Sequence, residues 1–308
     1  FVFPGQGSQA VGMGKELADA LPQAREVFEE VDEALQFNLS RLMWEGPEND
    51  LMLTENAQPA LMAVSVAAAR TIQRSGFDIA AKLAFVAGHS LGEYSALTVA
   101  WSLTLADCAR LLRHRGQAMQ RAVPVGEGAM AALLGAEVDL AQEIAKAAAR
   151  DGVCEVANDN GGGQVVISGS RAAVERAIDI AKERGVKRAL PLPVSAPFHC
   201  ALMQPAADAM AEVLESAKIV APCVPLVANV TASSVDEADE IRGLLVEQVT
   251  KMVRWRESVL FMRDEGVDKL VEVGSGKVLA GLAKRIDRDI ATLSIGSPRD
   301  IDDFFNSL

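Results

Sequence analysis

The sequence predicts an α/β protein in which a larger domain is interrupted by a smaller insert. Two short apolar runs, at residues 2–3 and 83–87, lead into glycine-rich turns, and the second is followed by helical sequence. Short runs of this kind are typical of buried parallel strands. Between residues 126 and 195 the pattern changes to brief strands alternating with two helices. Because longer helical sequence then resumes, the larger domain is expected to contain both ends of the chain.

Apart from the two predicted strands, the hydrophobic pattern of the first 125 residues is mostly helical. Helices are expected at five places: 12–20, 24–35, 58–74, 91–101 and 104–123. Pro59 stands near the start of the third, where proline is tolerated. Thr104 is a candidate N-cap of the fifth, with Asp107 at the spacing of a capping box.

The insert is expected to have the order strand, helix, strand, strand, helix, strand. Its six predicted elements are 129–134, 140–150, 153–157, 164–168, 172–184 and 186–194. Gly161, Gly162 and Gly163 suit the turn of the central hairpin. This order is the split βαβ arrangement, so a ferredoxin-like insert is predicted over 126–195, within a larger domain formed by 1–125 and 196–308.

The last segment returns to the larger domain. A helix is expected over 201–216 and strands over 225–230 and 269–273. The second strand ends in Gly274-Ser275-Gly276 and leads into a helix with apolar residues at Leu279, Leu282 and Ala283. Neither this turn nor Gly5-Gln6-Gly7 matches a phosphate-binding fingerprint.

Composition and charge exclude several classes of protein. Half of the residues are hydrophobic and 23% are charged, which is typical of a folded globular chain and not of a disordered one. The 42 acidic and 30 basic residues give a net charge of −12, which would repel a phosphate backbone. Only 14 residues are aromatic, one of them Tyr, so few side chains could stack on bases. Nucleic acid is therefore not an expected partner.

The sequence carries no signal for a membrane, a metal or a disulfide. Its longest apolar stretches are shorter than the roughly 20 residues of a membrane helix. No basic region marks the amino terminus, so secretion is not expected. The four cysteines stand far apart, without a CxxC pair or a histidine at metal-binding spacing: Cys108, Cys154, Cys200 and Cys223. We expect a cytoplasmic protein with no metal and no permanently bound cofactor.

Gly88-His89-Ser90-Leu91-Gly92 matches the motif G-x-S-x-G between a predicted strand and a predicted helix. The glycines permit a sharp turn that projects the Ser90 hydroxyl at the carboxyl end of the strand, where backbone N–H groups stabilise an oxyanion. Ser90 is therefore a candidate nucleophile, and the alternative is a serine N-cap in a tight turn. Gly5-Gln6-Gly7, at the end of the first strand, is a weaker candidate for a further N–H donor.

A nucleophilic serine needs a base, and the chain has three histidines. His89 is adjacent to Ser90, so its side chain is expected to point to the opposite side. His114 is expected on the exposed side of its helix. His199 follows Pro197, which breaks regular structure where the chain returns from the insert, and elimination favours it over a purely structural histidine. Cys200, beside it, is expected to be a small buried hydrophobe.

The helix over 104–123 has an apolar stripe that contains one arginine, Arg115. The stripe is formed by Leu105, Cys108, Leu112, Met119 and Ala122. A partly buried guanidinium needs a carboxylate or phosphate partner, and Gly116 leaves room for one. Periodicity does not decide between a ligand carboxylate near Ser90 and an internal salt bridge.

Six blocks of the sequence resemble, in the same order, those of the malonyl-CoA:acyl carrier protein transacylase family, the acyltransferases of fatty acid synthesis. They are Phe3-Pro4-Gly5-Gln6-Gly7-Ser8-Gln9, Thr54-Glu55-Asn56-Ala57-Gln58-Pro59-Ala60, Gly88-His89-Ser90-Leu91-Gly92-Glu93-Tyr94, Arg115-Gly116 through Met119-Gln120, Pro197-Phe198-His199 and Glu272-Val273-Gly274. The resemblance covers nearly the whole chain. It implies an α/β-hydrolase-like core with a ferredoxin-like insert.

The resemblance also implies the roles of individual residues. Ser90 resembles the serine that takes malonyl from coenzyme A as an ester. His199 resembles the base that activates this serine and later the phosphopantetheine thiol of the carrier. Arg115 resembles the arginine that holds the free carboxylate of malonyl, which favours the ligand over the salt bridge. Gln6 and the backbone N–H of Leu91 resemble the oxyanion hole.

Four further residues carry over from the family. Gln248 resembles the residue whose backbone carbonyl orients the histidine, and Asn158 and Met119 resemble residues that line the pocket. Phe198 resembles the malonyl-selective form, since polyketide relatives that prefer methylmalonyl usually have Ser there. An α/β-hydrolase would have an acidic triad member between serine and histidine, and none stands out, which indicates a Ser-His dyad.

The implied reaction is ping-pong transfer of malonyl from coenzyme A to holo acyl carrier protein through a malonyl-serine intermediate, which initiates fatty acid elongation. Alternatives are a serine esterase or thioesterase, a trans-acting polyketide synthase acyltransferase, and a carrier-binding module without catalysis. Because the family's carrier is acidic, local basic groups are expected to dock it: Lys187, Arg188, Lys251, Arg254, Arg256, Lys277, Lys284 and Arg285.

Overall fold

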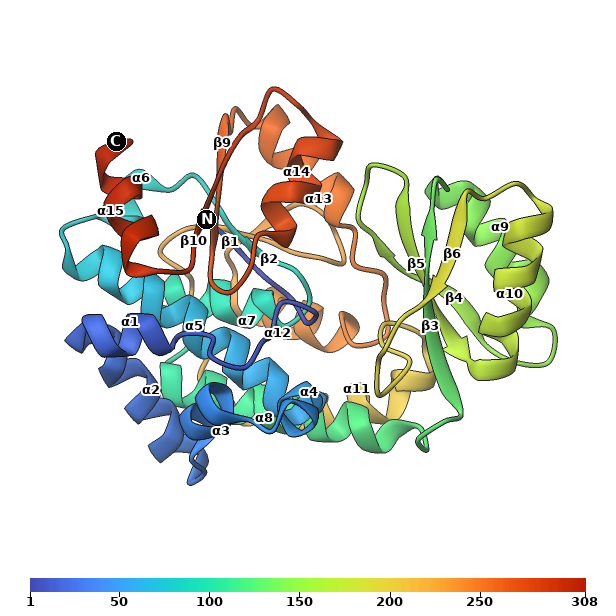
Figure 1. Ribbon diagram of the computed structural model, residues 1–308, viewed down its shortest axis with the longest axis horizontal. Coiled ribbons are helices and arrows are strands. Elements are labelled where there is room, and N and C mark those ends of the chain that lie inside the picture. The colour runs from blue at the N-terminus through green and yellow to red at the C-terminus, as the bar shows by residue number, and fades with distance from the viewer.

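The computed structural model describes all 308 residues and contains two separate sheets joined by helices (Figure 1). The larger sheet has the order β10-β9-β1-β2-β7-β8. Its strands are β1 (Val2–Phe3), β2 (Val86–Gly88), β7 (Leu226–Val227), β8 (Ser234–Val235), β9 (Lys269–Val273) and β10 (Ala291–Ile295). All neighbours in this sheet are parallel except β7 and β8. The carboxyl ends of five strands therefore meet at one edge, where ligands gather in sheets of this kind.

Helices cover both faces of the larger sheet. In the first 125 residues they are α1 (Lys15–Ala20), α2 (Pro22–Leu35), α3 (Leu39–Glu45), α4 (Glu48–Met52), α5 (Thr54–Arg74), α6 (Ile79–Lys82), α7 (Gly92–Val99) and α8 (Leu105–Ala122). After residue 195 they are the 3-10 turn η1 (Ala201–Met203), α11 (Gln204–Ser216), α12 (Ala238–Glu247), α13 (Trp255–Asp264), α14 (Val278–Ile286) and α15 (Pro298–Asn306).

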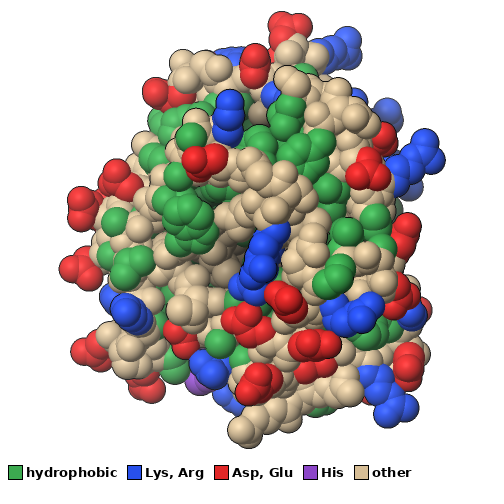
Figure 2. All heavy atoms as spheres, turned by 90° about the vertical axis from the view of Figure 1, so that its left-hand side faces the viewer, with side chains coloured by type: hydrophobic (Ala, Val, Ile, Leu, Met, Phe, Trp, Pro, Cys, Tyr) green, Lys and Arg blue, Asp and Glu red, His purple; other side chains and the backbone are tan.

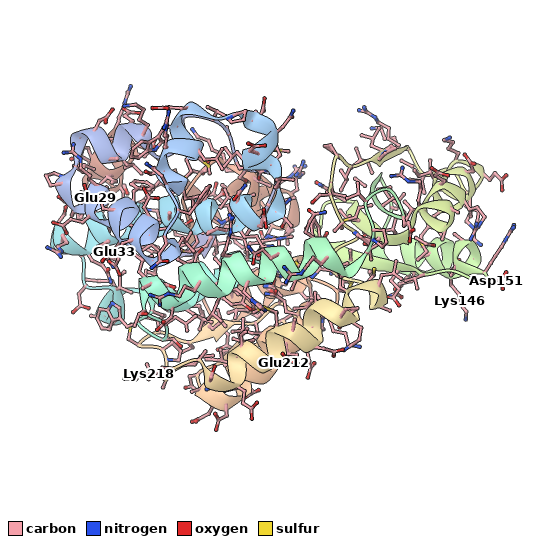
Figure 3. All side chains as sticks on the ribbon, turned by 90° about the horizontal axis from the view of Figure 1, so that it is seen from below. Glu29, Glu33, Lys146, Asp151, Glu212 and Lys218 are labelled. Carbon is pink, nitrogen blue, oxygen red and sulfur yellow. The ribbon has the colours of Figure 1, made fainter.

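The apolar strand residues divide between two cores because successive side chains face opposite sides of a sheet. Phe3 and Val86 face a large core of 65 buried residues that includes α5, α7 and α8. Val2 and Ala87 face a smaller core of 12 residues around Trp255 and α14. α8 lies alongside α11 and extends toward the second sheet (Figure 3).

The second sheet is antiparallel, with the order β4-β5-β3-β6. Its elements are β3 (Gly128–Leu134), α9 (Val138–Ala149), β4 (Cys154–Asp159), β5 (Gln164–Ser170), α10 (Arg171–Glu183) and β6 (Arg188–Pro191). α9 and α10 pack together over the sheet and share a separate core of 15 buried residues with it. The predicted succession of strands and helices between residues 126 and 195 is thus present.

Several predicted boundaries differ from the structure. The helix expected from residue 58 begins at Thr54, so Pro59 lies inside it. Pro59 has no N–H to offer the Glu55 carbonyl one turn earlier, and the Arg113 guanidinium donates to that carbonyl instead, at 3.3 Å. The strand expected over 225–230 ends at Val227, because Asn229 bonds to the turn after β2.

The surface is mixed in charge. On the face of the larger part that lies away from the second sheet, acidic and basic side chains alternate with hydrophobic ones (Figure 2). None of the helices is both long enough and apolar enough to cross a lipid bilayer.

Candidate active site

Ser90 lies on a tight turn between β2 and α7, in the left-handed region with φ of 53°. The turn needs glycine on both sides. A Cβ on Gly88 would lie 1.9 Å from the carbonyl carbon of Gly92, and a Cβ on Gly92 would lie 2.3 Å from the Phe3 carbonyl oxygen of β1. A non-glycine residue at positive φ is strained and persists only when its surroundings hold it.

Asn229, from the segment after β7, holds this turn on both sides of His89. Its Oδ1 accepts from the Ser90 backbone N–H at 2.7 Å, and its Nδ2 donates to the Gly88 carbonyl at 2.6 Å. Asn229 is fully buried. Its carboxamide therefore supplies the fixed support that the strained turn requires.

The base predicted by elimination lies beside the candidate nucleophile. His199 Nε2 is 2.8 Å from Ser90 Oγ, and His199 Nδ1 is 2.8 Å from the Gln248 backbone carbonyl. Because a carbonyl only accepts, Nδ1 carries the proton and Nε2 accepts from the serine hydroxyl. Burial, followed by the positive charge of Arg115, lowers the pKa of His199 to about 3. The ring is therefore neutral near pH 7 and able to take a proton.

Arg115 is buried, with 1% of its surface exposed, and all of its hydrogen-bond partners are uncharged. Nη1 donates to Gln58 Oε1 at 2.7 Å. Nη2 donates to Gln248 Oε1 at 2.7 Å and to Ser90 Oγ at 3.1 Å. Nε has no partner, and burial lowers the pKa of the guanidinium. The alternative of an internal salt bridge is therefore wrong, and the buried guanidinium beside Ser90 has no carboxylate in direct contact with it.

These groups face one pocket of about 480 Å³. Gln6, Leu91, Met119, Asn158 and Phe198 all line it, together with Ser90, Arg115 and His199. Gln248 lies behind His199, outside the lining. The backbone N–H groups of Gln6 and Leu91 donate to no other group of the chain, so both are available to an oxyanion. The structure thus brings all the predicted site residues together.

The other histidines differ in their surroundings. His89 Nε2 is paired with Asn160 Oδ1 at 2.9 Å, and its ring packs against Trp255, so it does not bond to Ser90 Oγ. His114 is half-buried and its Nε2 is inaccessible, so the prediction of an exposed side chain is wrong. Cys200 is fully buried, and burial raises the pKa of its thiol to about 11.

The sequence reasoning missed three polar residues that organise the site: Gln58, Glu93 and Asn229. Asn229 gave no signal except its position after a strand next to β2. Glu93 gave a clearer one, because it is the single charged residue in the sequence of α7, and the structure buries every residue of that helix. A carboxylate in such a helix must have specific partners.

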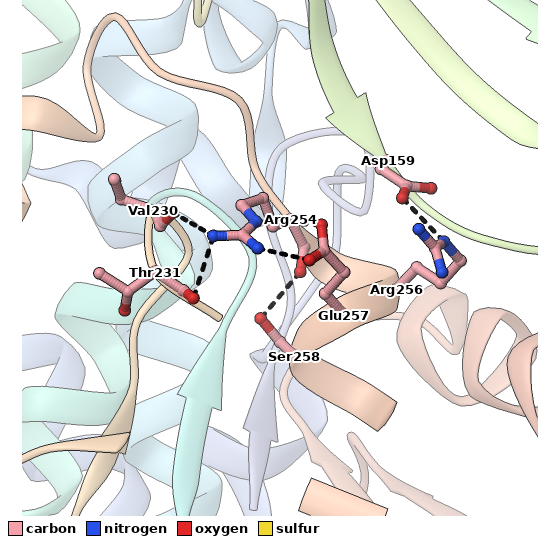
Figure 4. A network of polar contacts seen from close by, with 7 residues as sticks. All are labelled: Asp159, Val230, Thr231, Arg254, Arg256, Glu257 and Ser258. Carbon is pink, nitrogen blue, oxygen red and sulfur yellow. Dashed lines mark hydrogen bonds and ion pairs between the residues drawn. The ribbon is translucent and has the colours of Figure 1, made fainter. Parts of the chain in front are cut away.

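Two of the predicted docking groups are occupied within the chain (Figure 4). Arg254 donates to the Val230 and Thr231 carbonyls and pairs with Glu257. Arg256 pairs with Asp159 at 2.8 Å. Neither guanidinium is therefore free in the way that carrier docking would require.

Comparison with known proteins gives matches over nearly the whole chain. The family model described as acyl transferase domain matches residues 1–293. The malonyl CoA-acyl carrier protein transacylase of Escherichia coli (strain K12) is 47% identical over 298 residues, which are 97% of this chain and 96% of that protein.

Two solved structures are similarly close. The acyl-carrier-protein-S-malonyltransferase from Bartonella henselae is 54% identical, with a TM-score of 0.98 over 100% of this chain and 98% of that chain. A malonyl-transacylase solved in complex with its type II PKS acyl-carrier protein, in the holo form, is 43% identical, with a TM-score of 0.97 over 100% of this chain and 98% of that chain.

Proposed function

The chain belongs to the acyl transferase family and, within it, to the malonyl CoA-acyl carrier protein transacylases, and from this we propose that it transfers malonyl from coenzyme A to the phosphopantetheine thiol of holo acyl carrier protein. The observation that carries the proposal is the position of Arg115. Its Nη2 is 3.1 Å from Ser90 Oγ, and it has no carboxylate partner of its own. A substrate with a free carboxylate close to its reacting carbonyl supplies that partner.

In the first half-reaction, Ser90 Oγ attacks the thioester carbonyl carbon while His199 Nε2 takes the hydroxyl proton. The oxygen of the tetrahedral intermediate gains negative charge and accepts hydrogen bonds from the N–H groups of Gln6 and Leu91. The carbon–sulfur bond then breaks, and coenzyme A leaves as a thiol with the proton from His199. In the second half-reaction the carrier thiol gives its proton to His199 and attacks the ester carbonyl. The ester C–O bond then breaks, and His199 returns the proton to Ser90 Oγ, which regenerates the free enzyme.

The substrate carboxylate also assists the base. The charge of Arg115 is the second cause of the low pKa of His199. A malonyl carboxylate bound to Arg115 neutralises that charge, so protonation of His199 becomes easier with malonyl in the site. Acetyl provides no such compensation, and Arg115 therefore favours malonyl in the chemical step as well as in binding.

We further propose that residues 1–125 and 196–308 form an α/β-hydrolase-like core and that residues 126–195 form a ferredoxin-like insert. The parallel sheet with a nucleophile turn after β2 supports the first part. The antiparallel order β4-β5-β3-β6 and the separate core of 15 residues support the second.

Holo acyl carrier protein is the proposed partner, docked by the predicted basic groups that form no ion pair within the chain. Excluding Arg254 and Arg256, these are Lys187, Arg188, Lys251, Lys277, Lys284 and Arg285. Reversing the charge of Lys284 and Arg285 together is expected to raise the KM for carrier protein and leave acylation by malonyl-CoA unchanged. An unaltered KM for carrier protein would exclude this pair from docking.

The proposed function is tested by intact mass spectrometry of wild type and Arg115→Ala, each incubated with malonyl-CoA or acetyl-CoA in the absence of carrier. Wild type should acquire a malonyl adduct that persists until carrier is added. The variant should lose this adduct or carry acetyl instead. Rapid release of free malonate without an adduct would identify a hydrolase. Equal labelling of wild type by both acyl groups would show that Arg115 does not select malonyl over acetyl.

A further inference from the structure

Glu93 is a buried carboxylate to which the proposed mechanism gives no role. It lies in the first turn of α7, three residues after the nucleophile, and only 2% of its surface is exposed. It forms no ion pair with any Lys, Arg or His side chain. Burying a charge in this way is costly unless hydrogen bonds compensate for the lost water. The hydrogen-bond partners of the Glu93 carboxylate therefore indicate its role.

Both carboxylate oxygens of Glu93 accept hydrogen bonds from groups that hold the active site. Oε1 accepts from the backbone N–H of Asn229 at 2.7 Å, and Asn229 holds both sides of the nucleophile turn. Oε2 accepts from Nε2 of Gln248. Glu93 thus joins the support of Ser90 to the residue that contacts His199 and Arg115.

The Gln248 carboxamide has only one favourable orientation. Its Nε2 faces two acceptors, Glu93 Oε2 and the Ser90 carbonyl at 3.0 Å. Its Oε1 consequently faces Arg115 Nη2 at 2.7 Å. A reversed amide would place oxygen against two acceptors and NH₂ against a guanidinium, and both contacts are repulsive.

We propose that Glu93 is a positioning residue: its carboxylate fixes the Gln248 carboxamide, so that Gln248 presents Oε1 to Arg115 and its backbone carbonyl to His199. The inference rests on the proposed function and extends it. The Gln248 carboxamide lies between Glu93 and Arg115, so the Glu93 carboxylate compensates the positive charge of Arg115 without touching it. A direct ion pair would instead occupy the position that a substrate carboxylate takes on Arg115. Both oxygens face N–H donors, so the ionised form is the one that fits.

The first test is Glu93→Gln, assayed at pH 8, because burial raises the pKa of Glu93 to about 7. The variant places an NH₂ group against either the Asn229 N–H or Gln248 Nε2, so the amide loses its fixed orientation. We expect kcat/KM for malonyl-CoA to fall about tenfold to a hundredfold, and the ratio of malonyl to acetyl transfer to fall about tenfold. A change in that ratio separates positioning from simple loss of folded protein.

Glu272→Gln is the matched control. Glu272 is also fully buried, and its carboxylate accepts from the backbone N–H groups of Leu279 and Ala280 at the start of α14, away from the pocket. Its replacement should lower the melting temperature and leave the malonyl-to-acetyl ratio at the wild-type value.

The exchange Glu93→Gln with Gln248→Glu gives a second, independent test. It restores an N–H to oxygen pairing between positions 93 and 248 but brings a carboxylate directly onto Arg115. Because the new carboxylate at position 248 still faces the Ser90 carbonyl, we expect the melting temperature to recover only part of the way from that of Glu93→Gln. Malonyl transfer should stay at least tenfold below wild type and fall more than acetyl transfer, because the new carboxylate competes with the substrate. This variant carries the test alone if Glu93→Gln does not fold.

The inference is overturned if wild type transfers malonyl and both variants retain the wild-type malonyl-to-acetyl ratio. Failure of wild type to form a malonyl-enzyme at all would instead overturn the proposed function, and with it this inference. The two failures are distinguished by the wild-type sample in the same experiment.

Discussion

At the scale of single residues, the site depends on side chains whose charge differs from their usual state in water. His199 is held neutral, and Arg115 is a buried cation with uncharged partners. Glu93 is a buried carboxylate whose pKa is raised. All three ionisable groups are buried away from water, which ionisable groups ordinarily prefer. Buried groups with shifted pKa values concentrate at functional sites.

Gln58 supports one side of the Arg115 guanidinium, and its replacement should reduce malonyl selection. Gln58→Leu removes the acceptor of Nη1, so kcat/KM for malonyl-CoA should fall about tenfold, with a smaller change for acetyl-CoA. Gln58→Glu should reduce malonyl transfer further, because a carboxylate there pairs with Arg115 and competes with malonyl. Steady-state rates with both thioesters measure this, and equal losses for the two thioesters would contradict it.

The raised pKa of Glu93 and the lowered pKa of His199 affect stability in opposite directions. Between pH 4.5 and 7 the folded chain keeps a Glu93 proton that the unfolded chain releases, so this residue makes stability fall as pH rises. Between pH 3 and 6.5 the unfolded chain binds a His199 proton that the folded chain does not, so stability rises with pH.

Glu93→Gln removes the first of these effects and keeps the second. Its melting temperature should therefore increase more steeply with pH than that of wild type between pH 4.5 and 6.5. Calorimetry of both proteins across this range gives the comparison. Parallel curves would show that the pKa of Glu93 is not raised on folding.

Much of the residue-level site could be predicted, because chemistry limits the choices. Three histidines and one G-x-S-x-G motif left His199 and Ser90 as a pair. Periodicity alone could not exclude an Arg115 salt bridge, since 42 acidic residues offered possible partners. The family resemblance favoured a ligand, and the fold shows that no carboxylate reaches the guanidinium.

At the scale of elements, the start of α7 lies so close to β1 that position 92 has no room for a side chain. Gly92→Ala should cost about 3 kcal/mol or more of unfolding free energy, because its Cβ would meet the β1 backbone at 2.3 Å. Gly281→Ala in α14 is the control: nothing lies within 4 Å, so alanine should raise stability by about 0.5–1 kcal/mol. Urea unfolding compares the two, and equal effects would contradict the close approach.

Element types were more predictable than their ends. The helix 104–123 was located within one residue at each end, since Thr104 accepts from the Asp107 N–H as a cap should. Short strands such as β7 were overestimated, because apolar sequence continues after the chain has left the sheet to place Asn229. A side chain that bonds to a distant turn leaves no periodic pattern.

At the scale of the whole molecule, the second sheet is joined to the larger part through the end of β4. The Val253 N–H donates to the Ala157 carbonyl, and the Asp159 N–H donates to the Val253 carbonyl. Arg256 pairs with Asp159, whose side chain is only 3% exposed. This junction places Asn158 at the pocket wall.

Arg256→Ala should therefore loosen the second sheet against the larger part of the molecule. It leaves the buried Asp159 carboxylate without its charged partner, so the melting temperature should fall and the KM for malonyl-CoA should rise. Arg184→Ala, which removes the exposed pair with Glu143 between the end of α10 and α9, should change neither. An identical response of the two variants would show that the junction does not depend on the Asp159 pair.

The strand order of the larger sheet also has a consequence for how the protein is made. β1 lies in the interior of the sheet, where Val2 pairs with Glu272 of β9 as well as with β2. A ribosome synthesises β1 long before β9, so the edge of β1 that pairs with β9 stays open while the residues between these two strands are made. Gln248 also emerges late, so a nascent chain has its nucleophile long before the catalytic dyad is oriented. Malonyl transfer therefore begins only after Gln248 has reached His199, and until β9 is made the open edge of β1 is exposed to pairing with other strands.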